Sequence, residues 1–176
     1  MMKANKYKLK LTEEQKGKLA IQFGCARWVY NNALNRKQVA YKQDKTNLSR
    51  YQLQSLLVGM KKDSETVWLK QAHSQVLQSA LLHLDNAFKH FFAKRARFPR
   101  FKTKYGKQSC QYPQGVKIKD NLIFLPKIGW IKAVIHRKPI GKIKTVTVSK
   151  DTTGCYFASI LLDDGVVKPD PVKHIK

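Results

Sequence analysis

The chain has 176 residues, 43% of them hydrophobic, so it is long enough for one domain, or two small ones, with a real core. It carries 35 lysines and arginines against 11 acidic residues, and this net charge of +24 favours a polyanionic partner. No run of 18 apolar residues and no signal-peptide pattern occurs, so we expect no membrane partner and a cytoplasmic location.

The positive charge is concentrated in the middle of the chain. Residues 86–150 hold 17 basic residues and one acid, Asp120, whereas residues 1–85 hold 15 basic and 6 acidic residues. A surface that only needs to be soluble mixes both signs. We therefore expect phosphate groups to face residues 86–150, because phosphate binding releases counterions.

The first predicted element is a strand over residues 4–11. Apolar residues alternate there with lysines, which places a row of cations on one face. Thr12 followed by Gln15 is the signature of a capping box, so a helix is expected from there to about residue 41. The cations of the strand are candidate nucleic-acid contacts: Lys6, Lys8 and Lys10.

Two further helices are predicted before residue 98. Ser49 and Gln52 form a second capping box, which opens a short helix to about residue 60. A long amphipathic helix is expected from about residue 71 to 94, with an apolar stripe that includes Phe91 and Phe92.

After residue 98 the pattern changes from helix to strand. Two prolines and two glycines in residues 98–115 predict a loop or extended segment. Five short strands are then expected, at residues 116–119, 122–125, 130–135, 143–149 and 156–162. A lone first strand usually joins the later sheet, so the expected fold is α+β, a β-barrel or β-sandwich of about six strands with a helical insertion.

Cations alternate with aromatic residues around residue 98. The cations are candidate phosphate ligands because no acid lies nearby, although those closing the long helix also complement its dipole. Phe98 and Phe101 are expected to be buried in the core, with base stacking as the alternative. The candidate cations are Arg95, Arg97, Arg100, Lys102, Lys104 and Lys107.

Polar residues on helix faces and in loops form a second group of candidates. Amide and hydroxyl groups suit contacts to bases or backbone, and a solvated helix face or a turn is the alternative explanation. This group contains Ser74, Gln75 and Gln78 on the long helix, and Gln111, Tyr112 and Gln114 in the loop. Lys117, Arg137 and Lys138 are added from the strand region.

No internal catalytic site is predicted. Metal-dependent cleavage of a phosphodiester needs converging carboxylates, and most of the acids here sit at helix starts, strand ends or turns. His73, His83 and His90 are too far apart to form a ligand pair on one helix. We therefore predict no catalytic residue, no metal and no cofactor.

Four motifs, in this order, resemble the N-terminal half of the TnpB (OrfB) family, the accessory transposases of insertion sequences. They are CARWVYNNAL at residues 25–34, FPRFK at 98–102, LPKIGWIK at 125–132 and GKIKTVTV at 141–148. The resemblance implies a wedge-type β-barrel interrupted by an inserted helical bundle. It divides the chain into a first barrel strand (1–11), a helical recognition insertion (12–97), the remaining barrel (98–165) and a linker toward a nuclease domain (166–176).

The resemblance also implies a function in nucleic-acid recognition. Complete family members are RNA-guided DNA endonucleases that bind a transposon-end RNA and read a short motif beside the target. The implied partners are a transposon-end guide RNA and double-stranded DNA, in a bacterial cytoplasm close to the nucleoid. Motif reading would fall around the second helix and the start of the long helix, where this chain has Arg50, Tyr51, Gln54, Ser74, Gln75 and Gln78.

The family's RuvC-like nuclease domain begins at about the point where this chain stops. We therefore expect a recognition module that is not itself an enzyme. Two alternatives remain: a fragment of an RNA-guided endonuclease that is active only with a separate nuclease half, and a small basic RNA-scaffold protein of the ribosomal kind.

Overall fold

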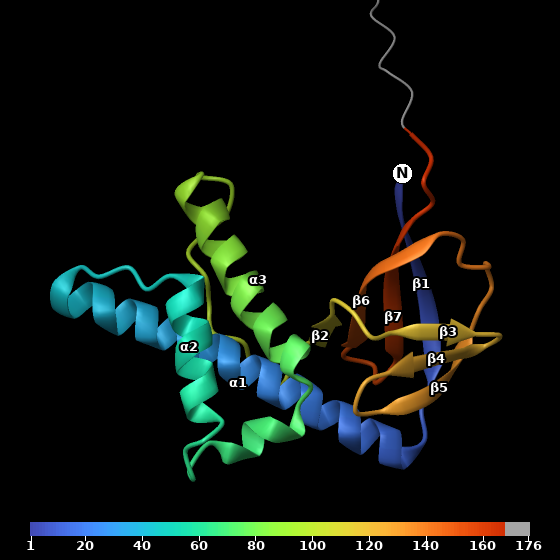
Figure 1. Cartoon of the computed structure of the whole chain (residues 1–176), viewed down its shortest axis with the longest axis horizontal. Helices are drawn as coiled ribbons and strands as arrows, with labels where there is room; N and C mark the ends of the chain where they lie inside the picture. Colours follow the sequence, from blue (N-terminus) through green and yellow to red (C-terminus); the bar gives the residue numbers. More distant parts are fainter. Residues whose placement is uncertain (168–176) are drawn as a thin grey trace, which may run out of the picture.

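The computed structural model describes residues 1–167, in which three α-helices and one 3-10 helix lie beside a seven-stranded sheet (Figure 1). In chain order the elements are β1 Met2–Lys10, α1 Glu13–Asp44, α2 Arg50–Met60, η1 Val67–Gln71, α3 Ser74–Phe92, β2 Gln108–Tyr112, β3 Lys117–Lys119, β4 Leu122–Leu125, β5 Gly129–Val134, β6 Lys142–Lys150 and β7 Tyr156–Asp163. Most of the predicted linker at residues 166–176 lies outside the described residues.

The sheet is antiparallel, with the strand order β2-β6-β7-β1-β5-β4-β3. Strand β1 lies between β7 and β5, with Tyr7 opposite Ala158 and Leu9 opposite Ala133. The sheet curls into a half-barrel, with β3, β4 and β5 turned across β1 (Figure 1). The predicted α+β class, in which the first strand joins the later sheet, is therefore confirmed.

One side of the curled sheet is apolar and forms the core of the half-barrel. Alternate residues of every strand except β3 point inward and are buried. They include Tyr7, Leu9, Tyr112, Ile123, Leu125, Ile131, Val146, Val148, Ala158 and Ile160. Residues opposite one another in the register share a face, so the intervening residues form a second, outward face, which we call the outer sheet face.

The expected number of about six strands is low by one because β2 was predicted as loop. This edge strand pairs with β6, from Gln108 opposite Lys150 to Tyr112 opposite Val146. Its five residues lie between glycine and proline positions and carry little apolar signal of their own. Its hydrogen bonds come from a strand that follows about 40 residues later, a pairing that local pattern cannot reveal.

The helices begin where the capping boxes predict. The Thr12 hydroxyl accepts from the Gln15 backbone N–H at 3.2 Å, and the Ser49 hydroxyl accepts from that of Gln52 at 3.3 Å. Helix α1 runs three residues beyond the predicted end, to Asp44.

The apolar stripe of α3 packs mainly against α1, and Leu77, Leu81 and Leu84 are buried. The predicted stripe extends too far, because Phe92 is 67% exposed. None of the helices in residues 1–167 is long and apolar enough to cross a bilayer.

Candidate nucleic-acid interface

The lysines of β1 lie on the outer sheet face, as the alternation predicts. Lys6, Lys8 and Lys10 are exposed, whereas Tyr7 and Leu9 between them are buried. No ion pair involves these three lysines within residues 1–167. Their charges are therefore free to meet an anion from solvent.

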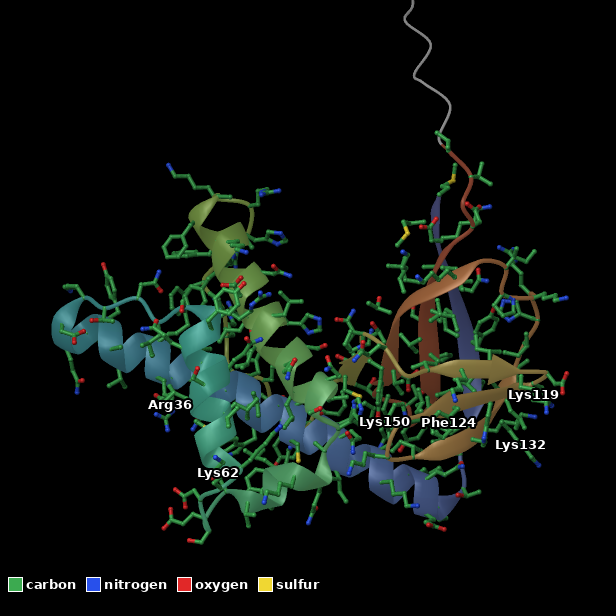
Figure 2. All side chains as sticks on the ribbon, in the orientation of Figure 1. Arg36, Lys62, Lys119, Phe124, Lys132 and Lys150 are labelled. Atoms are coloured by element: carbon green, nitrogen blue, oxygen red, sulfur yellow. The ribbon has the colours of Figure 1, made fainter. Side chains whose placement is uncertain are left out.

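Neighbouring strands extend this row of cations. Lys10 is opposite Lys132 of β5, and Lys132 is opposite Leu122 of β4, which in turn faces Lys119 of β3. Lys119 and Lys132 lie together at the same end of the sheet (Figure 2). Of the sequence candidates, Lys117 is exposed on this face as well. Lys119 and Lys132 were not selected from the sequence, although the Lys-Ile-Lys and Ile-Lys-Ala alternations mark them as outward-facing.

A second cluster of candidates lines a cavity of about 240 Å³ between the helices and β2, which we call the junction pocket. Its walls include the predicted residues Lys102, Lys107 and Gln111. They also include Arg27, His83, Gln108 and Ser109, which the sequence analysis did not select. Among residues 1–167, three cations and no carboxylate line the pocket, so it suits an anionic group such as a phosphate.

Hydrogen bonds hold the polar walls of the junction pocket in place. The Arg27 guanidinium donates to the Gln108 side-chain oxygen at 2.6 Å. The Gln108 amide in turn donates to the backbone oxygens of Thr103 and Gly106, at 3.0 and 2.9 Å. These bonds tie α1 to the start of β2 and to the loop before it.

The local environment changes two ionisable groups of the pocket. Burial lowers the pKa of His83, and the nearby Lys102 charge lowers it further. The hydrogen bond from His83 to Gln111, at 2.8 Å, acts in the opposite direction and raises this pKa. The balance of these effects favours the neutral imidazole. Desolvation also lowers the pKa of Lys102. Its ammonium lies 4.4 Å from the centre of the Tyr30 ring.

Four further cations of the segment that follows α3 do not line the junction pocket. Arg95, Arg97 and Arg100 are exposed, and Figure 1 shows the end of α3 pointing away from the sheet. Lys104 is exposed in the loop that returns to β2, with its ammonium 5.1 Å from the Tyr105 ring.

The expectation that Phe98 and Phe101 are buried in the core is wrong. Phe98 is 42% exposed and Phe101 is 50% exposed. Phe98 packs edge-on against Phe88 and Phe91 of α3, with ring centres 5.5 and 5.3 Å away, and is covered only in part.

The structure does not bring the two helical groups of candidates together. Arg50, Tyr51 and Gln54 lie on α2, on the side of the helices away from the sheet, whereas α3 begins beside β2 (Figure 1). Tyr51 is 69% exposed and lies 5.1 Å from the Arg50 guanidinium. On α3, Ser74 and Gln78 are exposed and Gln75 is half-buried.

The prediction that Tyr112 contacts a nucleic acid is wrong, because its side chain is buried. Tyr112 is fully buried on the inner side of β2, where its ring stacks on His73 at 6.0 Å. A ring in this position cannot reach a nucleic acid, so Tyr112 is not part of the candidate interface. Gln114 remains exposed after β2, and Arg137 and Lys138 are exposed in the loop between β5 and β6.

The acidic residues that the structure describes do not gather into a metal site. Within residues 1–167, no group of three or more histidine, cysteine, aspartate or glutamate side chains is placed to hold a metal ion. The described part of the chain thus offers cations, amides and aromatic rings to a ligand.

The chain is similar in sequence to known proteins, first over its N-terminal quarter. Residues 1–46 match the helix-turn-helix domain of the IS605 OrfB family. In the structure these residues form β1 and the single uninterrupted helix α1.

The chain is also similar to longer proteins. It is 37% identical over 170 residues to the "Putative RNA-guided DNA endonuclease InsQ" of Escherichia coli K12, covering 96% of this chain and 42% of that protein. A "Putative RNA-guided DNA endonuclease" of Streptomyces pristinaespiralis is 34% identical over 174 residues, covering 96% and 43%. The "Virulence protein VsdF" of Salmonella dublin is 38% identical over 116 residues, covering 61% of this chain and 98% of that protein. The chain spans less than half the length of the first two relatives.

Proposed function

Because the chain belongs to the TnpB (OrfB) family of insertion-sequence proteins, we propose that it is the nucleic-acid-binding recognition part of such a protein. In this proposal a transposon-end guide RNA lies on the outer sheet face and at the junction pocket. Double-stranded DNA beside the target meets the helices, and the described residues perform no cleavage themselves.

One observation carries the proposal: the excess of cations that have no acidic partner. Of the 17 basic residues in 86–150, only Lys89 and Lys144 form an ion pair within residues 1–167. Unpaired lysines and arginines at this density repel one another, and phosphate groups relieve that repulsion while releasing bound counterions.

A second candidate function follows from the names and lengths of the relatives. Two relatives are named as RNA-guided DNA endonucleases, and the alignments cover 42% and 43% of them. The chain would then work with a nuclease part that is supplied separately or as further sequence. Adding the remaining part of the Escherichia coli relative to this chain, its RNA and a target plasmid tests that candidate, and cleavage only with both parts would support it.

The proposed function is tested by recovering bound RNA from cells. The full chain is expressed together with its own genetic element, cross-linked and purified, and the co-purified RNA is sequenced. We expect enrichment of RNA from the end of that element over RNA recovered with an unrelated basic protein of similar charge. Recovery of abundant cellular RNA alone would instead support a general RNA-scaffold protein.

A further inference from the structure

We propose that the outer sheet face of β3, β4 and β5 is a stacking site for unpaired nucleotides, built on Phe124 and Trp130. The inference rests on the proposed function, and it adds a chemical class of ligand and two aromatic residues that the sequence analysis did not select.

The strand register aligns the two rings with a cation. Lys117, Phe124 and Trp130 are directly opposite one another on β3, β4 and β5, so their side chains emerge on the same face. The rings lie 5.4 Å apart with their planes tilted by 57°, and the Lys117 ammonium is 6.0 Å from the Phe124 ring. Figure 2 shows Phe124 on the part of the sheet that also carries Lys119 and Lys132.

The aromatic pair is accessible. Trp130 is 42% exposed and Phe124 is half-buried, although the strand residues that alternate with them, such as Ile123 and Ile131, are fully buried. The Gln15 side chain donates to the Trp130 backbone oxygen at 2.8 Å, which anchors the start of β5 to α1. The backbone is thus fixed while the indole remains open to a ligand.

A second row of residues places cations beside the rings. Lys119, Leu122, Lys132 and Lys10 are opposite one another on β3, β4, β5 and β1. This row lies two residues along the strands from the aromatic row, or about 7 Å. Asp120, in the turn after β3, is the one carboxylate between β3 and β5, and it forms no ion pair in the described part of the chain.

Exposed rings beside unpaired cations match the chemistry of a single strand. A base can stack on a ring only if its face is free, and in a duplex the faces are already covered by neighbouring base pairs. The lysines meet the phosphates of the same strand. A cross-strand aromatic pair also stabilises a sheet by itself, so the test must separate base stacking from stability.

The test compares probes that differ only in their bases. Binding of the full chain to a labelled oligouridylate of about 12 nucleotides is measured by fluorescence anisotropy, beside an abasic strand of the same length. We expect Trp130→Leu to weaken binding of oligouridylate at least about five-fold, and to leave binding of the abasic strand unchanged. Trp130→Phe keeps an aromatic face and should stay within about two-fold of the parent chain.

Trp68→Leu is the matched control, because Trp68 is a similarly exposed tryptophan (36%) on η1, and it should not change the affinity. Unchanged oligouridylate binding by Trp130→Leu would overturn the inference. So would an equal loss for both probes, because that loss does not depend on bases.

A measurement on the unmodified chain covers the case in which Trp130→Leu does not fold. An oligouridylate that contains 4-thiouridine should cross-link to a peptide spanning residues 128–134. Cross-links confined to other segments would overturn the inference, while salt-dependent duplex binding in the same preparation would leave the proposed function standing. Failure of the chain to bind any nucleic acid would overturn both the proposed function and this inference. A matched oligodeoxyuridylate shows whether the ligand is RNA or single-stranded DNA. Tighter binding of the ribose strand identifies RNA, because only RNA carries 2′-hydroxyls.

Discussion

Asn31 holds the segment after α3 against α1 with two hydrogen bonds. Its Nδ2 donates to the Lys102 backbone oxygen at 2.9 Å, and its Oδ1 accepts from the Lys102 backbone nitrogen at 2.8 Å. One side chain thus satisfies both backbone groups of a residue 71 positions away. It also keeps the Lys102 side chain at the wall of the junction pocket.

We expect Asn31→Ala to lower the free energy of unfolding by about 1–2 kcal/mol, because both hydrogen bonds to Lys102 are lost. Urea denaturation measures the change. Asn32→Ala is the control, since the Asn32 side chain accepts one bond from Arg36 within the same helix, at 2.9 Å and in an exposed position. That variant should change the free energy by less than about 0.5 kcal/mol. Equal effects of the two variants would contradict the anchoring role of Asn31.

His83 is expected to make stability depend on pH in the neutral range. Its folded-state pKa lies below the ordinary value of about 6.5, because burial disfavours the charged ring. The unfolded chain therefore binds this proton first as the pH falls. The contribution of neutral His83 to the free energy of unfolding is complete above about pH 6.5. It declines as the pH drops from there toward the lower folded-state pKa.

Denaturation curves recorded between about pH 7.5 and 5 test this expectation. The free energy of unfolding should decrease over that interval, and His83→Gln should reduce the decrease without abolishing it, because burial also lowers the pKa of His73. His90→Gln, at an exposed position on the same helix, is the control and should follow the parent chain. A profile of His83→Gln that is identical to that of the parent would show that His83 titrates alike in both states.

Two glycines show how the backbone conformation of a segment decides whether a side chain can be accommodated there. Gly141 precedes β6 with a φ of +112°, and a Cβ built there would lie 2.3 Å from the Asp163 backbone oxygen. This close approach lets the loop after β5 pack against the end of β7. Gly17, by contrast, lies inside α1 with open space around the position of a Cβ.

Alanine at these two positions should have opposite effects. Gly141→Ala should lower the free energy of unfolding by about 2 kcal/mol or more, since both the backbone angle and the contact with Asp163 oppose a side chain. Gly17→Ala should raise it by about 0.5–1 kcal/mol, because alanine favours the helix and restricts the unfolded chain. Thermal and urea unfolding of both variants measure the signs. Destabilisation by Gly17→Ala would indicate a contact at α1 that the structure does not contain.

At the scale of the whole molecule, the fold distributes its cations over separate regions. One group covers the outer sheet face, a second lines the junction pocket, and a third follows α3. The first group comes from the strands, whereas the second and third share residues 95–107, joined in the pocket by Arg27 of α1. A bound strand would meet many cations at once, so its affinity should depend steeply on salt.

Neutralising the β1 row should reduce that salt dependence. For the triple variant Lys6→Gln, Lys8→Gln, Lys10→Gln, we expect the slope of log affinity against log salt to become shallower by about 2 with single-stranded RNA, if all three lysines meet phosphates. The control variant removes three exposed lysines from the helical side: Lys42→Gln, Lys45→Gln, Lys62→Gln. It has the same net charge and should change the slope by less than about 1. Equal slopes for the two variants would mean that net charge alone, and not the outer sheet face, controls binding.

Local signals predicted much of the secondary structure. The capping boxes at Thr12 and Ser49 locate two helix starts, because the motif satisfies backbone donors within four residues. Strand alternation likewise assigned Lys6, Lys8 and Lys10 to an outward face. The edge strand β2 and the helix η1 were missed, since each is short and is held by distant residues: β6 pairs with β2, and Gln22 and Trp28 of α1 contact η1.

Composition determined the charge excess, and amino-acid order determined its concentration in residues 86–150 and the strand alternation that separates core from surface. Which of those surface residues share a site depends on how the strands and helices pack together. Lys10 faces Lys132, Lys117 lines up with Trp130, and Arg27 reaches Gln108, because antiparallel pairing and helix packing join segments that no local pattern connects. The same packing buried Tyr112 and exposed Phe98, since burial depends on which neighbouring element arrives to cover a side chain.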